Sequence, residues 1–273
     1  MNTKGFIKKV VTGDDPTLAG DFLATASGIS KTKIKDAMNK GAAWLRRNGR
    51  KRARIRRATM PLTSGDCIEL YYNEHLLTLA PPQARCLMDR RHYSVWFKPA
   101  GLMTQGTTYG DHCSLLRQAE LAFTPRRKVF PVHRLDREAT GLVMVAHTKT
   151  AAAKLSTLFS TGRIIKHYRL EVLGNLTSFD SQGTISLPLD GRNALTEFKI
   201  DRYDAARNIT TVDVRILTGR LHQIRRHFAM TGFPVMGDPR YGMGNKNTDG
   251  LKLAAVALEF TCPFSGEPTV IRL

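Results

Sequence analysis

Short apolar runs follow one another through the last two thirds of the chain, and this succession restricts the fold more than any other feature. Runs with strand character span residues 93–98, 141–147, 166–173, 195–201, 209–217, 251–261 and 268–273. Several of them have no helical pattern between them, whereas a doubly wound sheet needs a helix after each strand. We therefore predict an α+β fold with a mixed, largely antiparallel sheet flanked by helices. Those helices are expected at residues 112–123, 150–161 and 221–231.

The first part of the chain has a different pattern. Two helical segments, residues 17–27 and 31–40, are each followed by a glycine, and Ser30 is a suitable N-cap for the second. A strand is expected at residues 66–73. We predict that residues 1–75 form a small basic α/β module and that residues 92–273 form the main domain. Residues 76–91 are expected to be a linker, because they contain two adjacent prolines and few periodic apolar residues.

Positive charge is the second constraint. The 273 residues include 42 Lys and Arg against 23 Asp and Glu, a formal net charge of +19. Such a surplus attracts polyanions, of which nucleic acid is the commonest, with anionic membranes next. Between residues 46 and 57, eight of twelve residues are basic. Among them, Arg50, Lys51, Arg52 and Arg54 are the expected contacts to a phosphate backbone, which needs cations but no base-specific geometry.

Other classes of protein fit poorly. No run of about 18 apolar residues exists that would span a membrane, and no apolar stretch near the N-terminus is long enough for a signal peptide. We expect a cytoplasmic protein. The four cysteines are far apart in sequence, so neither a zinc site nor any other metal site is predicted.

The strongest local motif is the segment of residues 132–141 (VHRLDREATG), which leads directly into an apolar strand. Asp136 lies there among His133, Arg134 and Arg137, and neighbouring cations favour its ionised carboxylate. A carboxylate held ionised on a loop beside a rigid sheet is placed to act as a nucleophile or a base. Taken alone, the motif also fits an ordinary charged surface turn.

A second polar segment, residues 219–227 (GRLHQIRRH), lies on an expected helix. Residues three or four apart share a helix face, so His222, Arg225 and Arg226 form one possible polar face. The two histidines of the segment are five residues apart with no carboxylate between them, which argues against a metal site.

Two further segments are ambiguous on their own. Tyr168 shares a strand face with Leu170 and Val172, which is typical of a core tyrosine. Residues 237–242 (GDPRYG) indicate only a loop.

Together these segments resemble the RluA family of pseudouridine synthases, and they stand in the family's order. They are residues 98–102 (KPAGL), 133–136 (HRLD) with 140–141 (TG), 166–169 (KHYR), 220–227 (RLHQIRRH) and 237–242 (GDPRYG). The first 75 residues resemble, more loosely, the RNA-binding module of a small-subunit ribosomal protein. They depart from it after Gly41, where AAWL and the basic run replace a short strand. Residues 139–141 read Ala-Thr-Gly where family members more often have Thr-Ser-Gly.

The resemblance implies an isomerase that converts a uridine in RNA into its carbon-linked isomer. No group enters or leaves and no net redox change occurs, so no cofactor or metal is expected. Asp136 corresponds to the family's catalytic aspartate, Arg225 to its basic partner and Tyr168 to the tyrosine placed against the uracil ring. A uridine inside a helix must be flipped out before it can react.

The resemblance also assigns residues to RNA binding. Arg134 corresponds to the family residue that fills the space left by the flipped base, and Leu253 to the apolar residue that lines the pocket. His133 lies beside Arg134 in the same motif and is included among the expected RNA contacts. Ribosomal RNA of the large subunit is the favoured substrate and transfer RNA the next, and a monomer is expected.

Two other functions remain as alternatives. One is a catalytically inactive RNA-binding or ribosome-assembly factor, but the presence of Asp136, Arg225 and Tyr168 argues against lost activity. The other is a nucleoside hydrolase or glycosidase, which usually needs a second carboxylate or a metal. Glu138 is the only other acid close to Asp136 in sequence.

Overall fold

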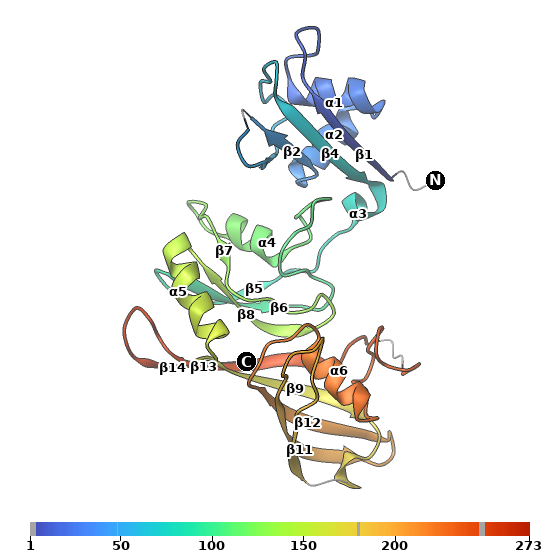
Figure 1. The fold of residues 1–273 in the computed structure, drawn as a ribbon, viewed down its shortest axis with the longest axis vertical. Coiled ribbons are helices and arrows are strands. Elements are labelled where there is room, and N and C mark those ends of the chain that lie inside the picture. The colour runs from blue at the N-terminus through green and yellow to red at the C-terminus, as the bar shows by residue number, and fades with distance from the viewer. Residues whose placement is uncertain (1–3, 48, 179–180, 246–248) are drawn as a thin grey trace. The chain divides into compact units, whose positions relative to one another are not determined.

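The computed structural model describes residues 4–47, 49–178, 181–245 and 249–273, and it divides the chain into two compact units (Figure 1). Unit 1 comprises Met1–Pro81 and Gln105–Gln118, and unit 2 comprises Pro82–Thr104 and Ala119–Leu273. The division is therefore not a single cut in the chain. A segment that follows the second strand of unit 2 packs with the N-terminal residues.

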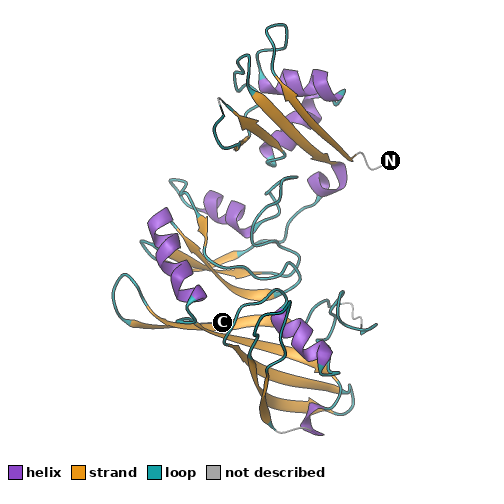
Figure 2. Cartoon of the chain, in the orientation of Figure 1, coloured by secondary structure: helices purple, strands orange, loops and turns teal. Residues whose placement is uncertain are grey.

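Unit 1 contains a four-stranded antiparallel sheet and two main helices (Figure 2). Its elements are β1 (Lys4–Val10), α1 (Ala19–Ser27), α2 (Lys31–Asn39), β2 (Ala43–Arg46), β3 (Ala53–Ile55), β4 (Cys67–Asn73) and the short α3 (Glu74–Thr78). The strand order is β1-β4-β2-β3. Helix α1 ends at Gly28, which adopts the left-handed conformation, and α2 begins after Ser30, whose side chain accepts the Lys33 N–H. The core joins the helices to one face of the sheet through Phe22, Leu23, Ile34, Met38, Ile68 and Leu70.

Three strands of unit 1 were not expected from the sequence. Residues 43–46 do form a strand, β2, although the sequence suggested that AAWL replaces one. Strand β1 reads KGFIKKV and is exposed along most of its length, so it lacks the alternation of apolar and polar residues that reveals a strand. Strands β2 (AWLR) and β3 (ARI) are only four and three residues long, which is too short for an alternation to be recognised in the sequence.

Unit 2 is built on one ten-stranded sheet. Its strands are β5 (Arg85–Asp89), β6 (Tyr93–Lys98), β7 (Phe130–Pro131), β8 (Thr140–Ala146), β9 (Ile165–Leu173), β10 (Gln182–Ile185), β11 (Thr196–Asp204), β12 (Ile209–Ile216), β13 (Leu253–Thr261) and β14 (Pro268–Arg272). The main path runs β10-β11-β12-β9-β13-β8-β6-β5, with β14 beside β13 and β7 beside β8. Among the described strands, only β8 and β13 pair in parallel. The predicted α+β class with a largely antiparallel sheet is confirmed.

Two helices pack on different parts of this sheet and create two cores. Helix α6 (Gln223–Met230) contributes Ile224 and Phe228 to a core shared with β9, β11 and β12, and the Phe228 ring lies 5.9 Å from the Phe198 ring of β11. Helix α5 (Lys149–Ser160) places Ala151 and Leu155 against β6, β8 and β13. Helix α4 (Leu115–Ala122) and the 3-10 turn η1 (Leu176–Ser178) complete the elements. The parallel β8–β13 pair joins the strands of one core to the strands of the other.

Some predicted boundaries shift. Residues 85–89, which the sequence placed in a linker, form β5 and pair with β6. Helix α6 begins at Gln223 and not at Leu221, because His222 has a φ of 52° and a left-handed conformation that cannot continue a helix. None of the described helices has the length and apolar character needed to cross a membrane.

Candidate active site

Arg225 joins two carboxylates in unit 2. Its Nη1 donates to Asp136 Oδ2 at 2.9 Å. On its other edge, Nε and Nη2 donate to the two carboxylate oxygens of Asp238 at 2.7 and 2.8 Å. Arg225 and Asp238 are buried, whereas the Asp136 side chain keeps 24% of its surface exposed. A buried guanidinium therefore holds in place a carboxylate that is still partly exposed to solvent.

The remaining neighbours of Asp136 are polar. His222 Nε2 lies 3.7 Å from Asp136 Oδ1, and the other ring nitrogen of His222 is 2.9 Å from the Tyr241 hydroxyl. The carboxylate of Glu138 lies 3.8 Å from Arg225 Nη1. Three carboxylates thus surround one guanidinium, so its positive charge is shared and does not fully neutralise Asp136.

Burial and charge set the protonation states around this cluster. Burial opposes ionisation of Asp238, but hydrogen bonds from Arg225 and from the amides of Tyr241 and Arg240 outweigh it and hold the Asp238 pKa below its ordinary value. Burial also opposes the charge on Arg225, yet its bonds to Asp238 and Asp136 raise the Arg225 pKa. Burial lowers the pKa of His222, against the opposing effect of Asp136, so the imidazole is neutral near pH 7.

Residues 98–104 hold the loop that carries Asp136. The fully buried Lys98 ammonium donates to four carbonyl oxygens, and two of these, of Arg137 and Ala139, belong to the loop. Thr104 fixes the loop on the N-terminal side of Asp136. Its hydroxyl donates to Leu135 O at 2.9 Å and accepts the Leu135 N–H at 3.1 Å. The backbone is therefore fixed immediately before and after the aspartate.

The start of α6 aims Arg225 at this loop. The Gln223 side chain accepts the Arg220 N–H at 3.0 Å and donates to Leu195 O at 2.9 Å, which ties the helix start to β11. Arg225 and Arg226 do not share one polar face as the sequence suggested. Arg225 points into the buried cluster, while Arg226 forms an exposed ion pair with Asp190.

Tyr168 and Leu253 lie on one face of the sheet. Leu253 pairs with Leu170 and Ala255 pairs with Tyr168, so these side chains share a face and join the α6 core. Burial, and secondarily the charge of Asp136, raises the Tyr168 pKa, so its hydroxyl stays protonated.

His133 and Arg134, the first two residues of the HRLD motif, differ from each other in exposure and in contacts. Arg134 is exposed and, among the described residues, forms no ion pair. The His133 ring stacks on Phe159 with a centroid distance of 4.2 Å, and its Nε2 accepts the Met144 N–H at 3.0 Å. Burial lowers the His133 pKa to about 3. The structure thus shows His133 packed against α5 and bound to β8, and its RNA contact stays a prediction.

The four basic residues of unit 1 that were predicted to contact RNA differ in their exposure and in their partners. Arg50 and Lys51 are exposed. Arg52 donates to Glu69 and to the Tyr71 hydroxyl, at 2.7 and 3.0 Å. Arg54 is bound by the Asp111 carboxylate and by Thr107 O, and its side chain is only 17% exposed. Arg54 therefore has partners within unit 1, whereas Arg50 and Lys51 are exposed to solvent.

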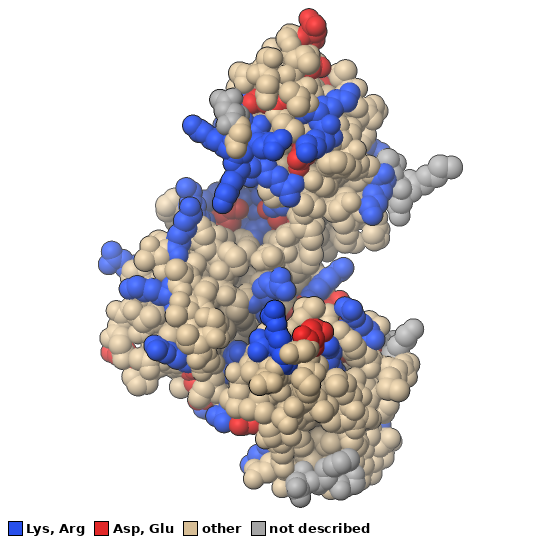
Figure 3. All heavy atoms as spheres, viewed as in Figure 1, with Lys and Arg blue, Asp and Glu red and all other residues tan. Residues whose placement is uncertain are grey.

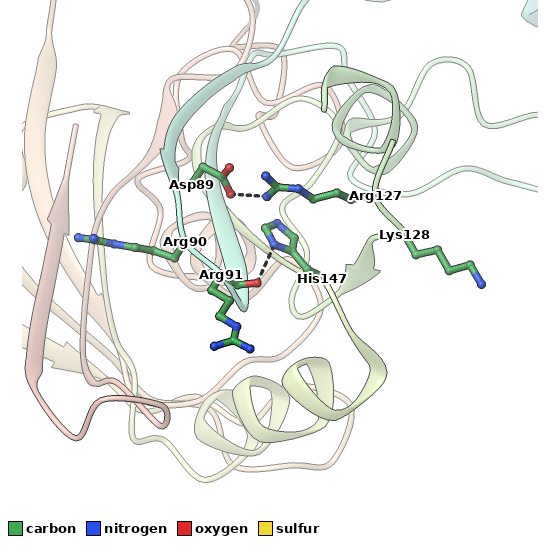
Figure 4. A pocket seen from close by; sticks show the side chains of 6 residues that line it. All are labelled: Asp89, Arg90, Arg91, Arg127, Lys128 and His147. Carbon is green, nitrogen blue, oxygen red and sulfur yellow. Dashed lines mark hydrogen bonds and ion pairs between the residues drawn. The ribbon is translucent and has the colours of Figure 1, made fainter. Parts of the chain in front are cut away.

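A separate cavity of unit 2 is lined by Asp89, Arg90, Arg91, Arg127, Lys128 and His147 (Figure 4). Its cations do not converge. Arg127 is paired with Asp89 at 2.7 Å, and Figure 4 shows the side chains of Arg90 and Lys128 pointing away from that pair. Among the described residues, no group of three or more His, Cys, Asp and Glu is arranged to hold a metal ion.

Several members of the cluster were missed by sequence reasoning. Asp238 and Tyr241 lie in the GDPRYG segment, which indicated only a loop. Glu138 was noted but had no predicted partner. Lys98 belonged to the KPAGL segment without an assigned role. A buried lysine is unusual enough to suggest a structural task, but nothing in the sequence shows that it will be buried.

Comparisons with known proteins identify the family of the chain. Residues 92–230 match the RNA pseudouridylate synthase family. The ribosomal large subunit pseudouridine synthase D of Xanthomonas campestris is 32% identical over 244 residues, which cover 76% of this chain and 71% of that protein. An uncharacterized RNA pseudouridine synthase of Aquifex aeolicus is 29% identical over 258 residues, covering 85% of this chain and 78% of the relative.

A solved structure shares the fold. Human RNA pseudouridylate synthase domain containing 1 covers 71% of this chain and 86% of its own, with a TM-score of 0.59 and 23% identity. The matched family region carries both the HRLD loop and the helix that presents Arg225 to it. The chain therefore belongs to the RluA family of RNA pseudouridine synthases and is an isomerase that acts on RNA.

Proposed function

We propose that Asp136 is the catalytic group and that it acts on a uridine flipped out of structured RNA. The observation that carries this proposal is the 2.9 Å bond from buried Arg225 to an Asp136 carboxylate that remains partly exposed. Arg225 is itself fixed by Asp238, so Asp136 is held in one orientation before substrate arrives. Such preorganisation suits a group that must meet developing charge.

The chemistry is balanced without any additional reactant. The bond between ribose C1′ and uracil N1 breaks, the base turns over, and C1′ joins C5. The proton lost from C5 is matched by one gained at N1. An ionised Asp136 serves this reaction by attacking C1′ or by stabilising the positive charge that develops on the sugar. The proposed reaction accordingly uses no cofactor or metal.

The neighbouring side chains have distinct proposed roles. Tyr168, whose hydroxyl stays protonated, packs against the uracil ring and helps the proton leave C5. Leu253 lies on the same sheet face and lines the apolar part of the pocket. Arg134 is exposed and unpaired among the described residues, so it is free to occupy the space left by the flipped base.

Large-subunit ribosomal RNA is the proposed substrate, with transfer RNA next. Relatives from Xanthomonas campestris and Pseudomonas aeruginosa carry the name ribosomal large subunit pseudouridine synthase D. The exposed cations of unit 1, including Arg50 and Lys51, add a second surface for a large RNA. We further propose that the protein works as a cytoplasmic monomer.

Tritium release tests both the reaction and the residue. Large-subunit ribosomal RNA and transfer RNA would be transcribed with uridine labelled at C5, because isomerisation transfers that tritium to water. We expect release with the wild-type chain and none above background with Asp136→Asn, while RNA binding changes less than about threefold because the substitution is nearly isosteric. Asp190→Asn is the matched control, since Asp190 is an exposed aspartate paired with Arg226.

Assaying ribosomal RNA and transfer RNA separately distinguishes the identity of the substrate from the identity of the catalytic residue. Release from transfer RNA alone would replace the proposed ribosomal substrate. Full release by Asp136→Asn would remove Asp136 from the mechanism. No release from either RNA, with binding retained, would favour the alternative of an inactive RNA-binding factor.

A further inference from the structure

We propose that the open face of the unit 1 sheet binds single-stranded RNA by stacking unpaired bases on Phe6 and Tyr71. This inference rests on the proposed RNA-binding role of unit 1 and specifies its surface and mode. The open face is defined by the side chains of β1, β2 and β4 that point away from α1 and α2. Lys4, Phe6, Lys8, Trp44, Glu69 and Tyr71 form it.

Strand register assigns these residues to one face. Phe6 lies opposite Tyr71, and Glu69 lies between Lys8 and Trp44. Successive side chains of a strand alternate between faces, so residues 69 and 71 of β4 point the same way. Ile68 and Leu70 point the other way, into the core beneath the helices. The helices therefore cover only one face of the sheet.

The open face carries aromatic rings that the core does not use. Phe6 keeps 54% of its surface exposed, and its ring lies 4.7 Å from the Tyr71 ring, with an interplanar angle of 39°. Tyr109, from the 105–118 segment of unit 1, meets Tyr71 edge to face with a centroid distance of 5.6 Å. Exposed apolar residues that occur singly are ordinary, but adjoining rings on a sheet face that the helices leave uncovered form a surface for a planar partner, with residues 107–109 along its border.

Cations surround these rings. Lys4 Nζ lies 5.6 Å from the centre of the Tyr109 ring, and the Arg52 guanidinium lies 4.8 Å from the Trp44 ring. Glu69 is the acid of this face, and Arg52 binds it at 2.7 Å, so its charge is already neutralised. Lys8 forms no ion pair among the described residues. Figure 3 shows Lys and Arg side chains gathered over this sheet, and the net positive charge complements a phosphate backbone.

This combination fits unpaired RNA better than a duplex. Bases in a duplex stack on each other and present no ring face, whereas unpaired bases stack on exposed aromatic side chains while nearby cations follow the phosphates. A strand of RNA that leaves the structured substrate would thus lie across β1 and β4. The stacking is tolerant of sequence, because every base has a planar face.

Fluorescence anisotropy with the full chain tests this directly. The probes are a labelled ten-nucleotide oligouridylate and a labelled ten-base-pair RNA duplex. Phe6→Leu and Tyr71→Leu remove a ring but keep an apolar side chain, whereas Phe6→Tyr and Tyr71→Phe keep the ring. We expect each leucine variant to weaken oligouridylate binding at least about fivefold, and each ring-retaining variant to change it less than about twofold.

A tryptophan readout gives a second measurement. The sequence has two tryptophans, and Trp96 is buried in unit 2, so Trp96→Phe leaves Trp44 as the sole reporter. Oligouridylate should quench Trp44 emission with the affinity found by anisotropy. The stacking proposal would be overturned if all four variants bound oligouridylate equally well. It would also be overturned if the leucine variants lost affinity for the oligouridylate and for the duplex to the same extent. Tight binding to anionic lipid vesicles with no binding of oligouridylate would overturn it as well.

The result is separable from the catalytic proposal. Asp136→Asn should bind oligouridylate as the wild-type chain does, because Asp136 lies in unit 2. Leucine variants that bind normally, in a protein that still releases tritium, would reject the stacking surface and leave the synthase function intact. A stacking surface that behaves as expected in a protein without tritium release would reject the proposed catalysis alone.

Discussion

At the scale of the residue, Arg225 is the organising side chain of the site. One guanidinium uses three nitrogens to bind two carboxylates, and only Asp136 of these two is partly exposed. Asp238 accepts two further hydrogen bonds, from the amides of Arg240 and Tyr241 at 2.8 and 2.9 Å. The accessible aspartate is thus oriented by an arginine that a buried aspartate orients in turn.

Replacing the buried aspartate should damage both stability and rate. In Asp238→Asn the Arg225 charge loses its buried partner, and breaking such a pair costs about 3–5 kcal/mol of unfolding free energy. We expect urea denaturation at pH 7 to show this loss and tritium release to show a lower kcat, because Arg225 no longer holds Asp136. A lower kcat without any loss of stability would contradict the buried ion pair.

The pH dependence of that loss follows from the Asp238 pKa. The pKa is depressed in the folded protein, so the native state binds fewer protons than the unfolded chain near the ordinary value of 3.8. The carboxylate therefore stabilises the fold fully above that value and loses its effect as the pH falls through the folded pKa. The difference between the wild type and Asp238→Asn should shrink below pH 3.8.

At the scale of the element, the Asp136 loop depends on its contact with residues 98–104. Lys98 is buried beneath the loop, and its four acceptors are the carbonyls of Pro99, Leu102, Arg137 and Ala139. Burial lowers the pKa of Lys98 to about 8, against the raising effect of Asp136 and Glu138. The ammonium therefore remains the main form at pH 7, and its three N–H groups are shared among the four carbonyls.

Removing this ammonium should loosen the loop. Lys98→Met leaves four carbonyls without their donor, and we expect a loss of at least about 2 kcal/mol in urea denaturation together with reduced tritium release. Lys149→Met is the control, because Lys149 is exposed at the start of α5, and its effect should stay within about 0.5 kcal/mol. Equal effects of the two substitutions would show that Lys98 does not hold the loop.

The parallel β8–β13 pair is a second element on which the site depends. Gly141 sits in this pair with a φ of 117°, and an added Cβ would collide with the backbone of Ala255. Gly141→Ala should destabilise the protein by at least about 2 kcal/mol in urea denaturation, since both the conformation and the close approach exclude a side chain. Gly13→Ala, where a Cβ meets open space, should change it little.

At the scale of the whole molecule, the path of the chain decides which variants can test RNA binding by unit 1. Unit 1 includes residues 105–118, and Asp111 of that segment binds Arg54 and Arg56. Deleting residues 1–75 would strip these contacts and expose the segment. Point substitutions of exposed cations are therefore the better test of the RNA affinity of unit 1.

Neutralising three exposed cations should flatten the salt dependence of RNA binding. In the triple variant Arg50→Gln, Lys51→Gln, Arg57→Gln, the slope of log affinity against log salt should fall by roughly two to three, since each phosphate that a cation neutralises adds roughly 0.7–0.9 to the slope. The control pair Arg127→Gln, Asp89→Asn leaves the net charge unchanged and should leave the slope unchanged. An unaltered slope in the triple variant would place the RNA contacts of unit 1 elsewhere.

The sequence by itself determined the fold class, most strands of unit 2 and the polypeptide segments that meet at the site. These features depend on local patterns, which are apolar periodicity, glycine helix ends and motifs of fixed spacing. It did not reveal β1, β2 or β3, because exposed or very short strands lack the alternation that a buried face imposes.

Only the tertiary structure decided which side chains act together. Asp136 and Asp238 lie on either side of Arg225 and are separated from each other by about a hundred residues of sequence, so no local pattern can show that one guanidinium binds both. The same holds for His133, whose stacking on Phe159 and hydrogen bond from the Met144 amide could not be foreseen from its motif. Residue identity limits what each side chain can do, and long-range packing fixes its partners and its exposure.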